Sequence, residues 1–139
     1  MAKLLDIIFG RHDPYAKEKG NLVSLAKKIG IAKPVELSGG LVSEDRKVGV
    51  YPKAHFNDRF YKSGEIFSLK LTVVEYDSLS REGGKVGTGK NWYDAALFDK
   101  VISSLDRIKL KYRIILAENG DYPALIETDD AVITIEHEK

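Results

Sequence analysis

The sequence has no cysteine and no glutamine, and only three histidines among its 139 residues. Without cysteine the chain forms no disulfide, thiolate nucleophile or cysteine-based zinc site, so its stability must come from packing. The missing glutamine, the few asparagines and the 31% of charged residues are typical of heat-adapted proteins. The absence of cysteine therefore excludes enzymes that use a thiolate nucleophile or a cysteine-based zinc site.

Long hydrophobic runs are missing as well. No apolar run approaches the roughly 20 residues that span a bilayer, and residues 3–9 are too short and too charged for a signal peptide. We therefore expect a cytoplasmic protein without a membrane segment. The length and the hydrophobic content of 43% predict a single folded domain covering residues 1–139.

The net charge of +1 hides an asymmetry along the chain. Residues 1–33 carry seven Lys or Arg against three acidic residues, whereas residues 118–139 carry one Lys against seven acidic residues. Such a division is typical of a polyanion-binding face, or of subunits that associate head to tail. Chance together with an acidic, solvated tail is the alternative interpretation.

Residues 92–138 predict an amphipathic helix followed by a three-stranded meander. The apolar stripe of the helix is Leu97, Phe98, Val101, Ile102, Leu105 and Ile108. Its opposite side is Asp99, Lys100, Ser103, Ser104 and Arg107. From Ile108 to Leu116 apolar residues alternate with Lys109, Lys111 and Arg113, which predicts a strand with one basic face. Turns are predicted at Asn119 and Gly120 and at Asp129 and Asp130.

The first half predicts a similar layout. A strand is expected at residues 3–9, then a polar connector, and then a helix from Leu22 to Ile29 that Asn21 caps and Gly30 ends. A hairpin around Gly39 and Gly40 follows, with strands at residues 47–56 and 65–76. The sequence thus predicts an α+β fold, with two helices packed on a mainly antiparallel β-sheet and one layout used twice without a residue-level repeat.

The glycine-rich stretch 84–91 resembles a phosphate-binding loop of the form GxxxxGK[ST]. Its last residue is Asn91, which lacks the hydroxyl that binds magnesium, and no further parallel strands follow. We therefore do not expect nucleotide hydrolysis. Either Lys85 and Lys90 hold a nucleic-acid phosphate at the start of the helix, or the stretch is a mobile loop in which Asn91 caps that helix.

Catalytic and metal-binding patterns are weak. His55, Asp58 and Glu65 could serve a metal-dependent nuclease, but their spacing matches no known zinc site or facial triad. No nucleophile elbow, catalytic triad or dinucleotide fingerprint occurs. The sequence favours a binding or assembly role over an enzyme, with no metal and no cofactor.

The order of elements resembles one domain of the DNA sliding clamps, the processivity factors of archaea and eukaryotes. In the first half the resemblance rests on the helix, on Leu41 and Asp45 in the following hairpin, on the strand from Val48, and on Phe60 and Tyr61. In the second half it rests on residues 97–138, which are similar to the helix and closing meander of a clamp domain.

This resemblance implies a self-associating, non-enzymatic protein of replication or repair that binds double-stranded DNA with its helices. The matching basic positions are Arg11, Lys17, Lys19, Lys27 and Lys28, and the glycine-rich stretch adds Lys85 and Lys90. Phosphate contacts of this kind confer salt-sensitive affinity with little sequence preference. The alternative is a small protein-binding module or inhibitor, of viral origin, that uses an edge strand and no DNA.

Self-association would need open sheet edges, because unpaired strands invite pairing with another chain. We expect these edges at the basic strand that carries Lys109, Lys111 and Arg113 and at the acidic segment 127–138. Their opposite charges favour a head-to-tail oligomer.

Overall fold

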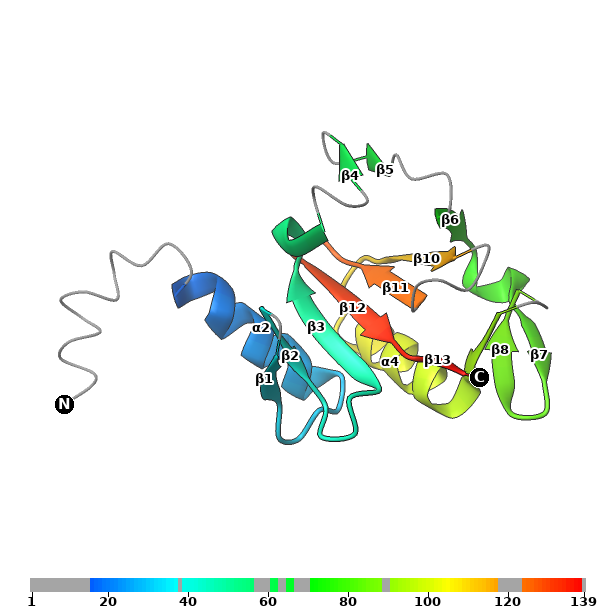
Figure 1. Cartoon of the computed structure of the whole chain (residues 1–139), viewed down its shortest axis with the longest axis horizontal. Coiled ribbons are helices and arrows are strands. Elements are labelled where there is room, and N and C mark those ends of the chain that lie inside the picture. The colour runs from blue at the N-terminus through cyan, green and yellow to red at the C-terminus, as the bar shows by residue number, and fades with distance from the viewer. Residues whose placement is uncertain are drawn as a thin grey trace, which may run out of the picture.

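The computed structural model describes residues 16–37, 39–56, 61–62, 65–66, 71–88, 91–117 and 124–138. In this part of the chain two α-helices pack on antiparallel sheets, which confirms the α+β prediction (Figure 1). The strand predicted at residues 3–9 and the turn predicted at Asn119 and Gly120 lie outside the described residues.

The main sheet has seven strands, and all its neighbouring strands are antiparallel. In spatial order they are β1 (Val35–Leu37), β2 (Gly40–Val42), β3 (Val48–Pro52), β12 (Ala131–Ile135), β11 (Ala124–Glu127), β10 (Arg113–Ala117) and β6 (Leu71–Val74). The meanders of the two halves meet where β3 pairs with β12. Outward from that pair, the first half continues with β2 and then β1, and the second half continues with β11 and then β10. The two halves therefore repeat the same layout in the sheet.

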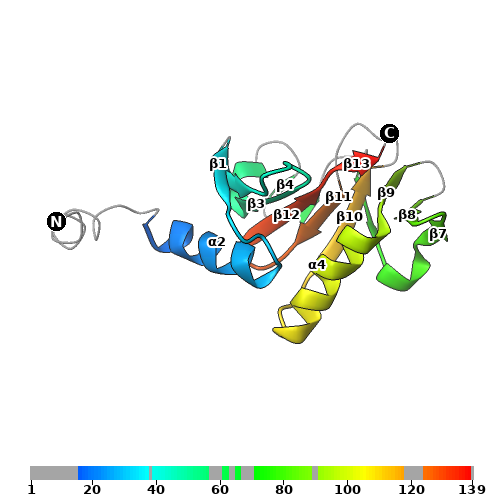
Figure 2. The same ribbon diagram turned by 90° about the horizontal axis from the view of Figure 1, so that it is seen from below.

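Both helices, α2 (Ala16–Lys28) and α4 (Ala95–Arg107), lie on the same face of this sheet (Figure 2). Their buried sides join the inward residues of both meanders in one large core, which includes Leu22, Phe98, Leu105, Val50 and Ile133. The other face of the sheet has a smaller core built from Phe56, Leu71, Ile115, Leu125 and Val132. The apolar stripe predicted for α4 is buried or half-buried along its whole length.

The two helices end in the same way. In α2 the N–H of Gly30 donates to the carbonyl of Lys27, and the N–H of Ile31 donates to that of Ala26. In α4 the N–H of Lys109 donates to Asp106 and that of Leu110 to Leu105. Both are Schellman ends, whose C′ residue has a positive φ of 99° at Gly30 and 57° at Lys109. The prediction that Gly30 ends the first helix is confirmed.

The predicted helix starts are wrong. Residues 16–20 already belong to α2, so Asn21 lies inside the helix instead of capping it. Ala, Lys and Glu in this stretch are good helix formers, and they carry the helix through Gly20. In α4 the cap is Asp94, whose carboxylate accepts from the N–H of Leu97 at 2.9 Å, and not Asn91.

Ser104 also differs from its predicted place on the exposed side of α4. The residue is 4% exposed, and its hydroxyl donates to the carbonyl of Lys100 at 2.8 Å. A serine can be buried on a helix because this local bond satisfies its hydroxyl.

The first part of the glycine-rich stretch belongs to a β-hairpin, because residues 85–87 form a strand that pairs with residues 80–82. A second sheet has the order β13-β9-β8-β7, built from β7 (Ser80–Glu82), β8 (Lys85–Gly87), β9 (Trp92–Asp94) and β13 (His137–Glu138). Gly83 and Gly84 join β7 to β8 with φ of 57° and 79°. A two-residue hairpin turn with positive φ at both positions favours glycine, and this explains the pair.

Several predicted strands are shorter than expected. The strand at residues 47–56 ends at Pro52, which has no N–H for the ladder, and the chain continues as the 3-10 helix η2 (Lys53–Phe56). The basic strand begins only at Arg113, because the end of α4 takes up the residues before it. The strand at residues 65–76 corresponds to two strands and a 3-10 helix. They are β5 (Glu65–Ile66), paired with β4 (Tyr61–Lys62), then β6, then η3 (Tyr76–Ser78).

The edges predicted for the main sheet are wrong, although β13 at the end of the acidic segment is an edge strand of the second sheet. Strand β10 lies between β11 and β6, and β12 lies between β3 and β11. Arg113 and Glu127 form a cross-strand pair inside one chain, with 2.5 Å between Nε and Oε1. The opposite charges that were expected to join subunits therefore join β10 to β11. In the main sheet the edge strands are β1 and β6.

Candidate functional site

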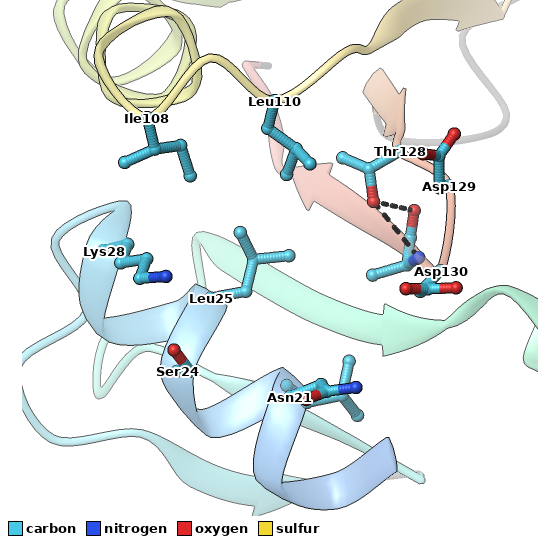
Figure 3. A pocket seen from close by; sticks show the side chains of 11 residues that line it. Asn21, Ser24, Leu25, Lys28, Ile108, Leu110, Thr128, Asp129 and Asp130 are labelled. Atoms are coloured by element: carbon cyan, nitrogen blue, oxygen red, sulfur yellow. Dashed lines mark hydrogen bonds between the residues drawn. The ribbon is translucent and has the colours of Figure 1, made fainter. Parts of the chain in front are cut away.

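A groove lies between α2 and the segment that follows α4, on the helix-covered side of the sheet (Figure 3). Its volume is about 720 Å³. The α2 wall is Asn21, Leu22, Ser24, Leu25 and Lys28. The other wall is Ile108 and Leu110, and the turn from β11 to β12 closes it with Thr128, Asp129, Asp130 and Ala131.

The groove has an apolar middle and charged ends. Leu25, Ile108 and Leu110 are half-buried and reach into it from opposite walls (Figure 3). Lys28 lies at one end, and Asp129 and Asp130 lie at the other. The site can therefore hold an apolar group whose two ends differ in charge.

Thr128 fixes the acidic end. Its backbone N–H donates to the carbonyl of Ala131 at 2.8 Å, and its hydroxyl donates to the same carbonyl at 3.0 Å. The N–H of Ala131 in turn donates to the Thr128 hydroxyl at 3.1 Å. These bonds close the turn, so Asp129 and Asp130 are exposed at the rim of the groove.

A second, smaller cavity of about 230 Å³ lies in the corresponding position of the other half. It is lined by α4, by the segment after α2, and by the turn between β2 and β3, which carries Glu44 and Asp45. Lys100 from α4 lies across this cavity and covers Gly30. A Cβ built on Gly30 would come within 2.6 Å of Cε and 2.9 Å of Nζ of Lys100.

The two helices and the segments that follow them are rich in exposed cations. The exposed basic residues of the two helices and of the segments that follow them are Lys27, Lys28, Lys33, Lys100, Arg107, Lys109 and Lys111. We call this set the basic helix surface. It gathers charge from both halves of the chain, although the two segments lie far apart in the sequence.

The acidic residues of α4 offset this surface less than their number suggests. Asp94 caps the helix, and Asp99 accepts from Arg81 at 2.9 and 2.7 Å and from the hydroxyl of Tyr76. The Arg81 guanidinium, bonded to the carboxylate, holds the pKa of Asp99 below its usual value. Burial and, after it, the nearby Asp106 carboxylate raise the pKa of the Tyr112 hydroxyl.

The structure brings only some of the predicted DNA-binding residues together. Lys27 and Lys28 are exposed on the last turn of α2. Lys17 and Lys19 belong to the same helix, with side chains outside the described ones, and Arg11 and Lys90 lie outside the described residues. Lys85 is at the opposite end of the molecule in β8, where its cross-strand partners are Glu82 and Asp94 (Figures 1 and 2).

The residues considered for a nuclease do not form a site among the described side chains. His55 stacks on Tyr51 with 5.0 Å between ring centroids and meets Phe56 edge-on. Asp58 and the side chain of Glu65 lie outside the described part. The side chains that the structure describes contain no cluster of three or more residues that could hold a metal ion.

The sequence interpretation missed the basic residues beyond α2 and the groove. Lys33 and Lys111 follow the helices, and a signal for them was present, because cations recur after both apolar stripes. Lys109 and Lys111 were assigned to a strand face, since their alternation with apolar residues has a period of two. The groove depends on contacts between distant segments, for which the sequence has no local pattern.

Comparison of this chain with protein-family models, curated proteins and solved structures found no match. None of the helices in the described residues is long and apolar enough to cross a membrane. The arguments about function therefore rest on the geometry of the molecule.

Proposed function

We propose that this protein is a non-enzymatic, self-associating DNA-binding protein of clamp-like design. The observation that carries the proposal is the basic helix surface, in which two helices on one face of a sheet direct lysines and an arginine to solvent. Cations on this scale attract the phosphate backbone with little sequence preference.

The paired layout of the sheet supports the clamp-like part of the proposal. Each half contributes a helix and a three-stranded meander, and the halves join at the pair of β3 and β12. The resemblance to clamp domains implies this arrangement, with both helices on the side that faces DNA.

Self-association is supported by the edges of the main sheet. The exposed large hydrophobic residues of the described chain are Val35, Leu37 and Val73, and all three lie on the edge strands β1 and β6. Paired positions connect the first edge to the second through the residues Val35, Val42, Gly49, Thr134, Leu125, Ile115 and Val73. Directly paired residues share a sheet face, so β1 of one copy placed beside β6 of another would continue this row and cover both exposed ends.

Binding to labelled duplex DNA tests the nucleic-acid part. We expect Lys27→Ala combined with Lys28→Ala to weaken binding for all sequences alike and to reduce the slope of log affinity against log salt by about 2, one unit for each lost phosphate contact. The matched control is Lys85→Ala, which should leave the slope unchanged because Lys85 is remote and flanked by acidic residues. An unchanged slope in the double variant would contradict the proposed surface.

Sedimentation at low and high salt tests the assembly part. The unmodified chain should form an oligomer larger than a dimer that survives moderate salt, since strand pairing and apolar contact are not screened. Val73→Asp should shift the chain toward the monomer, because it places a charge at the edge of β6. Ser103→Asp, an exposed change on α4, is the control. A strict monomer of the unmodified chain at high concentration would rule out the ring.

A protein-binding module without DNA is the second candidate, and the edge strand β1 favours it. All three of its residues are exposed, and it pairs only with β2 in the described sheet. An extended peptide could add to this edge, as in many recognition domains. A chain that fails to bind DNA at low salt but forms a closed dimer, or binds a peptide through β1, would support this reading.

A further inference from the structure

The two cavities of the helix layer are counterparts, one from each half. Each is bounded by one helix, by the segment that follows the other helix, and by a turn that carries two acidic residues. These residues are Glu44 and Asp45 in the smaller cavity, and Asp129 and Asp130 in the groove. The groove has about three times the volume of its counterpart.

A lysine side chain lines the smaller cavity. The Cε and Nζ atoms of Lys100 lie over Gly30 at the carboxyl end of α2, where the partial negative charge of the helix favours a cation. Glu44 and Asp45 add negative charge to the same cavity. The aliphatic stem of Lys100 lines it together with Leu97 and Val101.

The groove lacks an equivalent lysine. Lys100 lies nine positions before Lys109, the C′ residue of its helix, and the residue nine positions before Gly30 in α2 is Asn21. Asn21 lines the groove, but its side chain is short and uncharged. The two halves therefore share the acidic turn and the helix end, but the groove has no lysine at the position of Lys100, and Lys28 lies at its far end.

We propose that the groove binds a lysine-bearing peptide segment, whose lysine takes the place that Lys100 has along the wall of the smaller cavity. The ammonium contacts Asp129 and Asp130, and the aliphatic stem lies on Leu25 and Leu110. Lys109 stands at the position of Gly30 at the end of α4 and is itself a cation, so the ammonium of the peptide is directed to the turn.

The size and charge of the groove favour a peptide over a small amine. A volume of about 720 Å³ is typical of sites for ligands larger than one side chain. Residues beside the lysine of the peptide would cover Ile108 and the rest of the apolar middle. Lys28 at the far end repels a second cation, so the segment has one lysine, with neutral or acidic residues toward Lys28.

Titration calorimetry on the full chain tests this proposal with the blocked peptide Ala-Leu-Lys-Leu-Ala. Its control ligands are the same peptide with norleucine in place of lysine, and free hexylamine. We expect the lysine peptide to bind at least about tenfold more tightly than either control, which is the scale of one charge-assisted hydrogen bond. Equal binding of the norleucine peptide or of hexylamine would overturn the proposal, as would no binding of the lysine peptide at millimolar concentration.

Two variants locate the site. Asp129→Asn combined with Asp130→Asn should weaken the lysine peptide by about tenfold or more, whereas Glu44→Gln in the counterpart cavity should change nothing. Asn21→Lys supplies the missing internal lysine, so it should fill the groove and abolish peptide binding in a folded chain. Retained affinity in both the aspartate variant and Asn21→Lys would place the peptide elsewhere and refute the assignment.

Discussion

The two halves of this protein have the same order of elements but differ in how their outer strands are paired. The outer strands of the second half are joined by the ion pair of Arg113 and Glu127, and β6 covers β10. In the first half the corresponding strand β1 is exposed and carries Val35 and Leu37. The difference is that β6 covers the outer strand of the second half, whereas the outer strand of the first half is itself an edge of the sheet.

The two helices also differ in the size of the side chains that they bury. When the two helices are aligned at their Schellman ends, Leu105 of α4 corresponds to Ala26 of α2. Both side chains are fully buried. A large side chain thus anchors α4, whereas a small one lets α2 lie close to the sheet. Substitutions at matched positions test how much this difference contributes to the free energy of unfolding.

The largest effect is expected at this buried pair. Leu105→Ala should lower the free energy of unfolding by about 2–5 kcal/mol, because it removes buried methyl groups and leaves a cavity. Ala26→Leu should cost about 1–3 kcal/mol through overpacking. Ser103→Ala, which is exposed, is the silent control. Denaturant unfolding measures all three, and equal costs for Leu105→Ala and Ser103→Ala would contradict the packing of α4.

A smaller effect is expected at the helix ends, with opposite signs in the two halves. Gly30→Ala should destabilise by about 1–2 kcal/mol, since a positive φ is unfavourable for a residue with a Cβ, and Lys100 would have to move. Lys109→Gly should stabilise by about 0.5–1 kcal/mol, because glycine relieves the same strain. Thermal unfolding measures both. Destabilisation by Lys109→Gly would mean that its side chain makes contacts that outweigh the strain.

The smallest effect concerns two carboxylates in acid. The pKa of Asp99 is lowered chiefly by Arg81, and that of Asp45 chiefly by the Ser43 hydroxyl. A lowered folded-state pKa adds stability above the unfolded value, near pH 4, which is lost as the pH falls through the folded value. Asp99→Asn should flatten this acid loss by under about 1 kcal/mol, since the pair is partly exposed.

Unfolding measured between pH 2 and 6 provides the test. Asp45→Asn is the comparison from the first half, and it should flatten the profile less, because Asp45 is exposed and has no cation bonded to its side chain in the manner of Arg81. An unchanged acid profile in Asp99→Asn would show that the contact with Arg81 adds nothing to folding.

Sequence patterns predicted the fold class because helical and strand periods are local. The stripe of α4, the end of α2 at Gly30 and the turn at Asp129 and Asp130 all depend on neighbours within a few residues. The start of α2 and the hairpin at Gly83 and Gly84 were missed, because good helix formers outweighed the signal of a cap and glycine was taken for a loop.

The candidate site was predicted only in part. Lys27 and Lys28 were named from their charge and from the resemblance to clamp domains, and the structure shows that both are exposed. The covering of Gly30 by Lys100 and the edge positions of β1 and β6 depend on contacts between distant segments. For the same reason, the pairing of Arg113 with Glu127 inside one chain was not foreseen.

The junction of β3 with β12 also has a consequence for how the chain folds. Val50 pairs with Ile133, so the contact that unites the halves links residues far apart in the sequence, and contacts of that kind slow folding. Each meander can form from neighbouring segments, but the sheet closes only when residues 131–135 have been synthesised. Until then β3 pairs only with β2 and leaves its other edge open, and a nascent chain in this state is prone to aggregation.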